Sequence, residues 1–181
     1  MKDFSLHLLD LAQNSLRAAA TVISFNFDED VTANRLVIDI EDNGQGMDPA
    51  ATKKAVDPFF TTRTTRKVGL GISLFAAAAK RCGGEFTICS KPGKGTKLTA
   101  IFLLNHWDTP PMGDMAGTII TLIAGNPGVD FIYRHRRGKA EYRFDTRIIK
   151  ELLKDVPISN PTVLAYLEEH IQKGLTQMEI L

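Results

Sequence analysis

Three polar residues are spaced so that they share one side of a predicted helix near the start of the chain. Asp10, Asn14 and Arg17 follow one another at i, i+4 and i+7, which places a carboxylate, an amide and a guanidinium on one helical face. The remaining face is apolar and carries Leu8, Leu9, Ala12, Leu16 and Ala19. This pattern predicts a helix that packs with one side and offers the other to a ligand, although a solvated polar face would look the same.

A glycine-containing loop follows a predicted strand at Glu41-Asp42-Asn43-Gly44-Gln45-Gly46-Met47. Gly44 and Gly46 allow positive φ and a close approach of a ligand to the backbone. Asp42, at the end of the strand, can accept a hydrogen bond from an exocyclic amine. An ordinary Asp-Asn-Gly turn is the alternative interpretation.

A second glycine-containing segment, Lys67-Val68-Gly69-Leu70-Gly71-Ile72, leads into an alanine-rich helix. Free amides and the helix dipole converge at such a helix start and favour a phosphate group. Arg63, Arg66 and Lys67 lie just upstream and could reach phosphate oxygens. The segment lacks the third glycine of a Rossmann fingerprint, and the chain contains no Walker A loop.

The elements that must position these residues follow from periodicity and punctuation. Helices are predicted at about 5–20, with Ser5 as N-cap, in a short segment from Asp48-Pro49, and at 70–81; strands are predicted at 22–27, 36–40, 85–90 and 97–104. A polar turn is expected at 28–34. Pairs of strands separated by helices indicate an α/β fold of the α+β sandwich type, a mixed sheet covered by helices on one face.

Two adjacent prolines in Asn105-His106-Trp107-Asp108-Thr109-Pro110-Pro111-Met112-Gly113 end regular structure. We therefore predict a domain at 1–105, a linker at 106–112 and a small α/β tail at 113–181. The tail is expected to hold helices at 113–125, 146–153 and 161–174 and a hairpin of strands 129–134 and 140–145. Basic and aromatic residues alternate over 131–147, which is compatible with a nucleic-acid surface, but core packing with a solvated basic face is favoured.

Bulk composition sets limits on location and partners. The formal net charge is +1, so nothing draws the whole chain to nucleic acid or to an anionic membrane. Two cysteines are too few for a disulfide framework and fit a reducing compartment. No apolar run approaches membrane-spanning length, and the start does not resemble a signal peptide. We therefore expect a cytoplasmic protein.

Five segments in order resemble the boxes of one family. HLLDLAQNSLRAAAT is similar to the N box, DNGQGM to the G1 box, DPFFTTR to the F box, KVGLGI to the G2 box, and GKGTKLTAIF to the last box and closing strand. The resemblance is to the GHKL ATP-binding domains of histidine kinases, gyrases and mismatch-repair ATPases, over about the first 105 residues. It implies the Bergerat-type ATP-binding fold.

The resemblance also implies a role for individual residues. Asp42 would hydrogen-bond the adenine amino group, Asn14 would bind Mg²⁺, and Asp10 would be the catalytic base. The remaining ATP-binding positions are Gly44, Gly46 and Met47 at the adenine pocket, Phe59, Arg63 and Lys67 in a lid at 59–67, Gly69, Leu70 and Gly71 at the phosphates, and Thr96 near the adenine.

Three positions depart from the family pattern. Asp10 stands where Glu is usual, which shortens the base by one methylene; Lys67 replaces a glycine, and Arg17 replaces an Asp of the mismatch-repair branch. The tail pattern PPMGDM, FDTR and VPISNP is similar to stand-alone bacterial GHKL proteins associated with iron-hydrogenase gene clusters, which implies a regulatory or accessory role.

The function expected from this resemblance is magnesium-dependent ATP binding by a kinase-like regulator. Histidine kinases carry a helical hairpin with a phosphoacceptor histidine, but here only nine residues precede Asp10, and His7, His106, His135 and His170 are interpreted as surface or structural. A phosphoryl group would therefore pass in trans to an unidentified partner protein. The alternative is an ATP-gated binding module of the anti-sigma type with little or no turnover; whether the protein forms a homodimer is left open.

Overall fold

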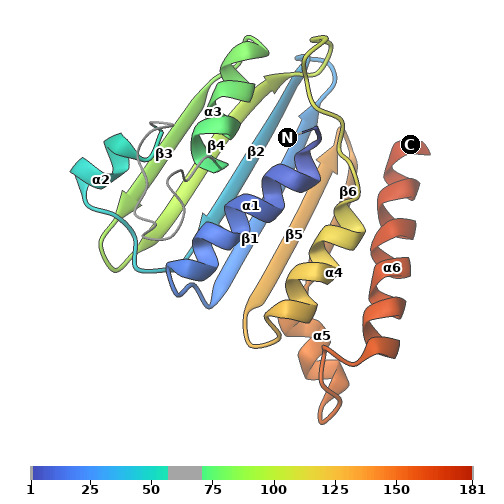
Figure 1. The fold of residues 1–181 in the computed structure, drawn as a ribbon. Coiled ribbons are helices and arrows are strands. Elements are labelled where there is room, and N and C mark those ends of the chain that lie inside the picture. The colour runs from blue at the N-terminus through green and yellow to red at the C-terminus, as the bar shows by residue number, and fades with distance from the viewer. Residues whose placement is uncertain (1, 57–70, 181) are drawn as a thin grey trace.

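A mixed β-sheet of six strands, in the order β3-β4-β2-β1-β5-β6, forms the centre of the described structure. The computed structural model describes residues 2–56 and 71–180, and Figure 1 shows their arrangement. The strands are β1 (Val22–Asp30), β2 (Arg35–Asp42), β3 (Phe86–Lys91), β4 (Gly95–Leu103), β5 (Asp130–Arg137) and β6 (Ala140–Asp145).

Helices α1, α3 and α4 lie across one face of this sheet (Figure 1), and α6 packs against α4 and β6. The helices are α1 (Phe4–Arg17), α2 (Pro49–Lys54), α3 (Gly71–Arg81), α4 (Met115–Gly125), α5 (Thr146–Leu153) and α6 (Pro161–Ile180). Within 2–56 and 71–180, none of these helices combines the length and apolar character needed to cross a bilayer.

The sheet is mixed: β1 pairs in parallel with β5, and every other pair of neighbouring strands in the described sheet is antiparallel. In the parallel pair Phe25 lies opposite Tyr133. The hairpin β5–β6, which follows the proline-rich break, therefore continues the sheet that the preceding residues begin. The predicted α/β fold, a mixed sheet with helices on one face, is confirmed.

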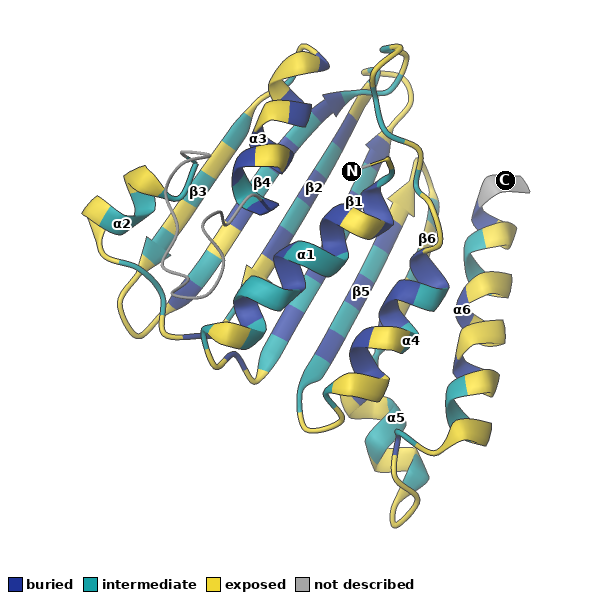
Figure 2. Cartoon of the chain, viewed as in Figure 1, coloured by how far each residue is buried: buried dark blue, intermediate teal, exposed yellow. Residues whose placement is uncertain are grey.

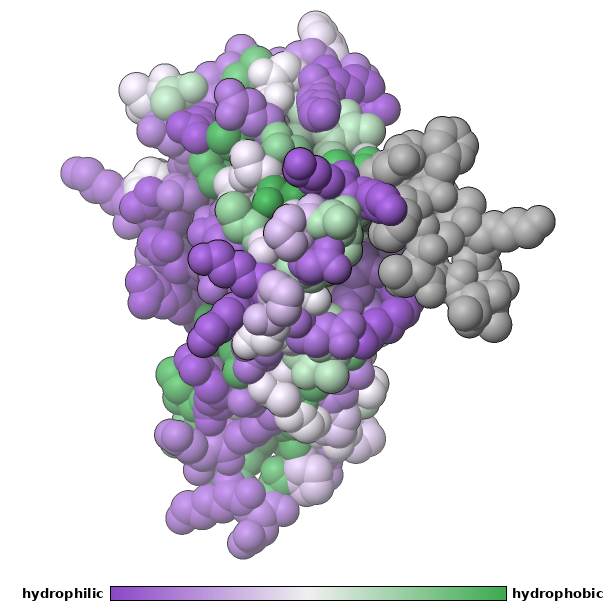
Figure 3. All heavy atoms as spheres, turned by 90° about the vertical axis from the view of Figure 1, so that its left-hand side faces the viewer, coloured by the Kyte–Doolittle hydropathy of each residue, from purple (hydrophilic) through white to green (hydrophobic). Residues whose placement is uncertain are grey.

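Alternation along the strands separates a buried face from an exposed one (Figure 2). On β1 the side chains of Ile23, Phe25 and Phe27 are buried beneath the helices, as period-2 patterning predicts. The opposite face is polar: Lys97 pairs with Asp39 at 3.4 Å. Viewed from the side of α2 and β3, the surface is mostly hydrophilic (Figure 3).

The basic hairpin at 131–147 follows the core-packing interpretation. Its aromatic residues Phe131, Tyr133 and Phe144 are buried. Its arginines lie outside and find acidic partners: Arg134 pairs with Glu141 at 2.7 Å, and further ion pairs join Arg143 to Glu141 and Arg136 to Asp28.

The first helix begins and ends earlier than predicted. Asp3, not Ser5, is its N-cap, because the Asp3 carboxylate accepts a hydrogen bond from the Leu6 N–H at 2.9 Å. The Ser5 hydroxyl donates to the same carboxylate at 2.7 Å. The helix stops at Arg17, and Ala19 has a φ of 56°, so its methyl group is exposed rather than part of the apolar face. β1 extends three residues beyond the predicted end, to Asp30, because its pairing with β2 continues to Asp30 and its pairing with β5 to Glu29.

A strap formed by residues 109–113 completes the start of α1. Phe4 N–H donates to the carbonyl oxygen of Pro111 at 2.9 Å, and Ser5 N–H donates to that of Met112 at 3.0 Å. The first amides of a helix have no hydrogen-bond acceptors inside the helix. Here a segment about a hundred residues away in sequence supplies acceptors for two of these amides. The strap thereby fixes the end of the helix that carries Asp10 and Asn14.

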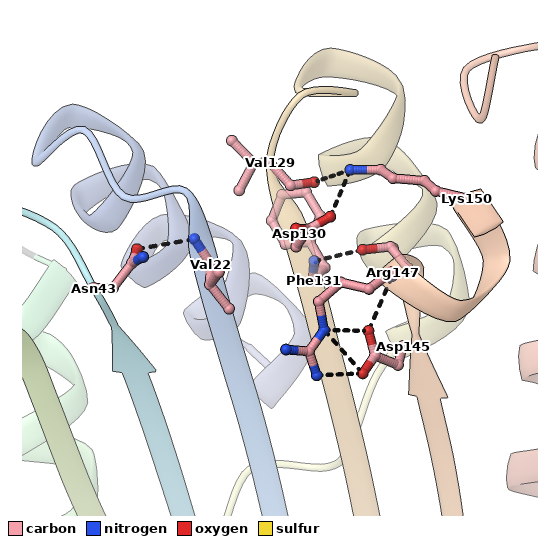
Figure 4. Close-up of polar contacts among 9 residues, drawn as sticks. Val22, Asn43, Val129, Asp130, Phe131, Asp145, Arg147 and Lys150 are labelled. Carbon is pink, nitrogen blue, oxygen red and sulfur yellow. Dashed lines mark hydrogen bonds and ion pairs between the residues drawn. The ribbon is translucent and has the colours of Figure 1, made fainter.

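Polar contacts join α5 to the start of β5 (Figure 4). The Lys150 ammonium donates to Asp130 Oδ1 at 2.6 Å and to the Val129 carbonyl oxygen at 3.1 Å. The buried Thr146 hydroxyl accepts a hydrogen bond from Phe131 N–H at 2.8 Å. The start of the strand that borders β1 is therefore held by α5 as well as by the sheet.

His7 is a buried histidine on α1. It is 2% exposed, its ring lies 5.2 Å from that of Phe75, and within the described structure its Nδ1 has no hydrogen-bond partner. Burial lowers the pKa of His7 from 6.5 to about 4, because charging the ring would require desolvating it. The ring is therefore neutral at pH 7.

We predict that acid destabilises the fold partly through His7. Between pH 6.5 and about 4 the unfolded chain binds a proton at His7 that the folded chain excludes, so the free energy of unfolding falls as pH is lowered, by up to about 3 kcal/mol. His7→Phe should remove this part of the pH dependence in urea denaturation at about pH 7 and about pH 4.5. His170→Phe, at an exposed position, is the control; equal pH dependence in all three proteins would contradict the assignment.

Candidate functional site

The polar face of α1 meets the first residue of α3. A β-carbon built on Gly71 would lie 2.2 Å from Asp10 Oδ2 and 3.3 Å from Asn14 Nδ2, so any larger residue would displace the carboxylate. Gly71 is buried and begins α3, where helix amides without intrahelical partners and the positive end of the dipole are found. The structure thus brings together a carboxylate, an amide and a helix N-terminus from two segments about sixty residues apart.

Asp42, the last residue of β2, is held against α1. The Ser15 hydroxyl donates to Asp42 Oδ2 at 2.6 Å, and the Gly44 N–H donates to Oδ1 at 2.9 Å. Each carboxylate oxygen retains a lone pair for another donor. Because Ser15 belongs to α1, this bond ties the end of β2 to the helix that carries Asp10 and Asn14.

Ser15 was missed by the sequence reasoning, although a signal exists. It is 5% exposed and belongs to the buried stripe of α1, one helical turn beyond Leu11 and next to Ala12 along that stripe. A polar side chain on such a stripe needs a hydrogen-bond partner, and its partner is the candidate ligand-binding carboxylate.

Arg17, the third residue of the predicted polar face of α1, contacts Asn14. Its Nη1 donates to Asn14 Oδ1 at 3.0 Å. A guanidinium carries only donors, so the amide oxygen of Asn14 is turned toward a cation, which is the orientation that a metal ligand also needs. The i+7 spacing from Asp10 had predicted that Arg17 shares this face of the helix.

The glycines of the loop after β2 fit against the chain's own backbone. Gly46 has a φ of +65°, and a β-carbon on it would lie 2.0 Å from the Lys91 carbonyl oxygen; one on Gly44 would lie 2.6 Å from that of Ala18. We expected a ligand to approach these glycines, whereas the nearest atoms are protein carbonyls. The glycines therefore let the loop pack between the end of α1 and the β3–β4 turn.

Met47 and Thr96 meet at Ser90, on β3. Met47 N–H donates to Ser90 Oγ at 2.8 Å, and Ser90 donates to the Gly95 carbonyl oxygen at 3.0 Å. The Thr96 hydroxyl lies 2.8 Å from Ser90 Oγ; since a hydroxyl has one proton, Thr96 is the donor in this pair. Thr96 is also the register partner of Asp42 across the β2–β4 pair.

A cavity of about 500 Å³ opens between α2 and the β3–β4 end of the sheet. Asp42, Ser90 and Thr96 line one part of it, and Lys53 and Lys94 are among the residues that bring positive charge. Its volume lies within the range of small-molecule sites. Asp42 thus borders this cavity and is also bonded to Ser15 of α1.

Asn43 fixes the loop to the turn after α1. Its Oδ1 accepts hydrogen bonds from Thr21 N–H and Val22 N–H, both at 2.9 Å, and its Nδ2 donates to Thr21 Oγ1 at 2.8 Å; Figure 4 shows the bond to Val22. Gln45 N–H adds a bond of 2.8 Å to the Ala18 carbonyl oxygen. Asn43 therefore positions Asp42 rather than pointing to a ligand.

Five of the candidate residues lie outside the described part of the chain: Phe59, Arg63, Lys67, Gly69 and Leu70. The same holds for the expected lid at 59–67. Within 2–56 and 71–180 there is no group of three or more His, Cys, Asp or Glu side chains that could hold a metal ion. A metal at the Asn14 amide would therefore need most of its ligands from outside these described side chains, and Mg²⁺ commonly keeps several waters and phosphate oxygens as ligands.

The part of the chain that carries this site matches the sequence model of a known family. Residues 3–106 match the model described as "Histidine kinase-, DNA gyrase B-, and HSP90-like ATPase". A putative sensor protein of Shewanella frigidimarina is 40% identical over 56% of this chain and 16% of its own length. The sensor protein kinase FleS of Pseudomonas aeruginosa is 36% identical over 54% of this chain and 24% of its own length. The chain thus spans less than a quarter of either relative.

Solved structures share the fold at lower identity. The ATPase domain of Aquifex aeolicus MutL, solved with ADP, superimposes with a TM-score of 0.52 and 16% identity over 74% of this chain and 60% of that one. The N-terminal domain of a DNA repair protein gives 0.53 and 14% over 80% of this chain and 52% of that one. These superpositions extend over more of the chain than residues 3–106.

We predict that Asn43→Ala destabilises the protein by about 1–2 kcal/mol, because two backbone amides and a hydroxyl lose their side-chain partner. Asn43→Asp is the matched control: it keeps the acceptor for both amides and should restore most of the loss. Urea denaturation measures both variants. An Asn43→Ala midpoint equal to that of the wild type would show that the clamp is not needed.

Proposed function

The chain belongs to the histidine kinase-, DNA gyrase B- and HSP90-like ATPase family, whose domain binds ATP, and we propose that this protein transfers a phosphoryl group from ATP to a partner protein in trans. The observation that carries the proposal is the meeting of Asp10, Asn14 and Gly71 at the start of α3. That arrangement combines a carboxylate, a cation-facing amide oxygen and helix amides at one point, as phosphoryl transfer requires.

Asp42 is proposed to recognise the adenine base. Its carboxylate is fixed by Ser15 and Gly44, so it need not reorganise to accept a hydrogen bond from the exocyclic amine. Thr96, its register partner, and Gly44, Gly46 and Met47 form the surrounding backbone and wall. The cavity of about 500 Å³ beside Asp42 and Thr96 gives space for a base-sized group.

Asn14 is proposed to hold Mg²⁺ together with the phosphates. The fit rests on the orientation of its amide: Oδ1 already accepts from the cationic Arg17, and magnesium prefers oxygen ligands. When bound, Mg²⁺ neutralises charge on the phosphate oxygens. Arg17, beside it, is positioned to add a second positive charge to the same group.

Asp10 is proposed as the base that orients the attacking group. Its carboxylate lies against Gly71, at the helix start where the phosphates are expected. Gly69, Leu70, Phe59, Arg63 and Lys67 are proposed to contact the nucleotide from the segment that leads into α3. The role of this segment rests on sequence resemblance alone.

The acceptor is proposed to be another protein. His7 and His135 are buried, at 2% and 6% exposure. His106 belongs to the turn after β4, where its Nδ1 accepts a hydrogen bond from Asp108 N–H at 3.1 Å, and His170 stacks on Tyr166 of α6. All four histidines are therefore occupied by structural contacts or lie on elements remote from Gly71.

A second candidate, an ATP-gated binding module with little turnover, is favoured by one observation. The base position holds Asp10 rather than the longer Glu of the family pattern, and its carboxylate is already in contact with Gly71. A base that must reach further to a water or hydroxyl loses rate. In this case ATP would change which partner the protein binds instead of being consumed.

Nucleotide binding is tested by calorimetric titration of ATP with and without Mg²⁺. Asp42→Asn should weaken ATP binding by about 1–3 kcal/mol, because an amide N–H replaces an acceptor. Asp39→Asn is the matched control, since it lies on the same strand but on the opposite face of the sheet. Equal isotherms for the two variants would contradict the adenine assignment.

The metal role of Asn14 is tested in the same titration. Asn14→Ala should abolish the increase in ATP affinity that Mg²⁺ gives the wild type, because the only proposed protein ligand is lost. Asn26→Ala makes the same chemical change on the open face of β1 and should leave that increase intact. A full Mg²⁺ effect in Asn14→Ala would exclude this residue as the ligand.

Phosphotransfer is tested by incubating the protein with labelled ATP and candidate partner proteins. Transfer of label to a partner that disappears with Asp10→Asn, while ATP binding persists, supports the kinase. Nucleotide-dependent retention of a partner without labelling supports the binding module instead. Partners retained equally with and without ATP, and never labelled, would contradict both.

A further inference from the structure

A second cavity, of about 350 Å³, lies at the other end of the sheet from Asp42. Glu29 on β1 and His135 on β5 line it, and the strap and α6 enclose it. Ile23, the register partner of Asp42, is six residues before Glu29 along β1, so the cavity lies about 20 Å from the nucleotide site. It is a separate site, and its ligand does not depend on the proposed function.

The cavity contains a carboxylate of which one oxygen is hydrogen-bonded to protein and the other is free. Glu29 is 8% exposed. Its Oε1 lies 2.6 Å from His135 Nε2, and His135 Nδ1 lies 3.1 Å from the Tyr133 hydroxyl. Its Oε2, in contrast, has only the Arg137 Nε at 3.8 Å, beyond hydrogen-bond range. This oxygen is therefore open to the cavity and free to accept a hydrogen bond from a group bound there.

Arg137 supplies the opposite charge at the same place. It lines the cavity, its side chain is 45% exposed, and among the described residues its only ion-pair partner is Glu29. A guanidinium presents a fork of donors that matches a carboxylate. The cavity therefore offers one free acceptor of a carboxylate and a set of free guanidinium donors side by side, with no net charge when His135 is neutral.

One part of the remaining lining is apolar. Met112 of the strap and Leu175 and Met178 of α6 face the cavity, and their flexible side chains suit an aliphatic or aromatic group. A simple anion would meet the Glu29 carboxylate, and a simple cation would meet Arg137. A zwitterion with an apolar substituent satisfies both charges and the wall.

We propose that this cavity binds a free α-amino acid with an apolar side chain. The amino acid carboxylate pairs with the Arg137 guanidinium, the ammonium group donates to Glu29 Oε2, and the side chain packs on Met112 and Leu175. The bond between His135 and Glu29 Oε1 holds the carboxylate in position and remains intact.

The test is calorimetric titration of the full chain with L-leucine, L-methionine and L-phenylalanine. At least one should bind saturably. For the amino acid that binds, the analogue without the amine (isocaproate for leucine) and the analogue without the carboxylate (isoamylamine for leucine) should each bind roughly tenfold or more weakly, since each loses one charge-assisted interaction. Absence of saturable binding by all three amino acids, or an analogue that binds as tightly as its parent, would overturn the proposal.

Two arginines on β5 provide a matched pair of variants. Arg137→Gln should reduce amino acid binding roughly tenfold or more, whereas Arg136→Gln should not change it. Their side chains are equally exposed, at 45% and 46%, but Arg136 lies on the other face of the strand and pairs with Asp28. Glu29→Gln should also reduce binding, and if its buried site impairs folding, the arginine pair still decides. Equal affinities for Arg136→Gln and Arg137→Gln would refute the assignment.

Discussion

The fixed position of α1 is the constraint on which both the group around Gly71 and the second cavity depend. The helix is packed on the sheet through buried residues such as Phe4, Leu8 and Leu11. The strap carbonyls hold its first amides, and Gln45 N–H holds the Ala18 carbonyl oxygen just after its last turn. Asp10 and Asn14 contact Gly71 only because both ends of the helix are tied, since a shift of one turn, about 5.4 Å, would break every contact that defines the site.

The parallel pairing of β1 with β5 extends this constraint to the last third of the chain. Without β5, the edge of β1 would expose unpaired backbone groups and the aromatic residues Phe25 and Phe27 would lose Tyr133 as a neighbour. A parallel pair needs a crossover, and here α4 provides it while also packing against α1. The residues after the proline-rich break are therefore structural support for the helix that carries the site.

Local chemistry explains what the sequence could predict. Period-2 alternation and turn residues depend on near neighbours in sequence. These local patterns were sufficient to predict the strands, the hairpin at β5–β6 and the start of α5. The pairing partners of the strands could not be predicted in this way. Alternation in β1 shows that the strand has a buried face, but it does not show that β5 lies beside it. The strap could not be predicted for the same reason. Nothing in the sequence around Pro111 and Met112 indicates that their carbonyl oxygens accept hydrogen bonds from the Phe4 and Ser5 amides.

The candidate site shows the same division. Asp10 and Asn14 could be found from helical spacing, and Asp42 and Gly71 from their places beside predicted elements. The hydrogen bonds that orient these residues could not be predicted. Nothing in the sequence indicates that the Ser15 hydroxyl donates to Asp42, which lies opposite it in the fold. The positive φ expected in the loop is found at Gly46, but the sequence did not show that the Lys91 and Ala18 carbonyl oxygens occupy the space that a side chain at Gly46 or Gly44 would need.

The second cavity and the Asp10–Asn14–Gly71 group are connected through α1 and the strap, and this has an energetic consequence. Strap residues line the second cavity and also cap α1, whose Asn14 lies ten residues, about 15 Å, along the helix from Phe4. A ligand that binds the second cavity more tightly when the strap holds α1 would stabilise the arrangement of Asp10, Asn14 and Gly71. By linkage, a ligand at that group would then raise affinity at the second cavity by the same factor. Such a coupling would act through the two strap hydrogen bonds to Phe4 and Ser5, because they join the lining of the second cavity to the start of α1.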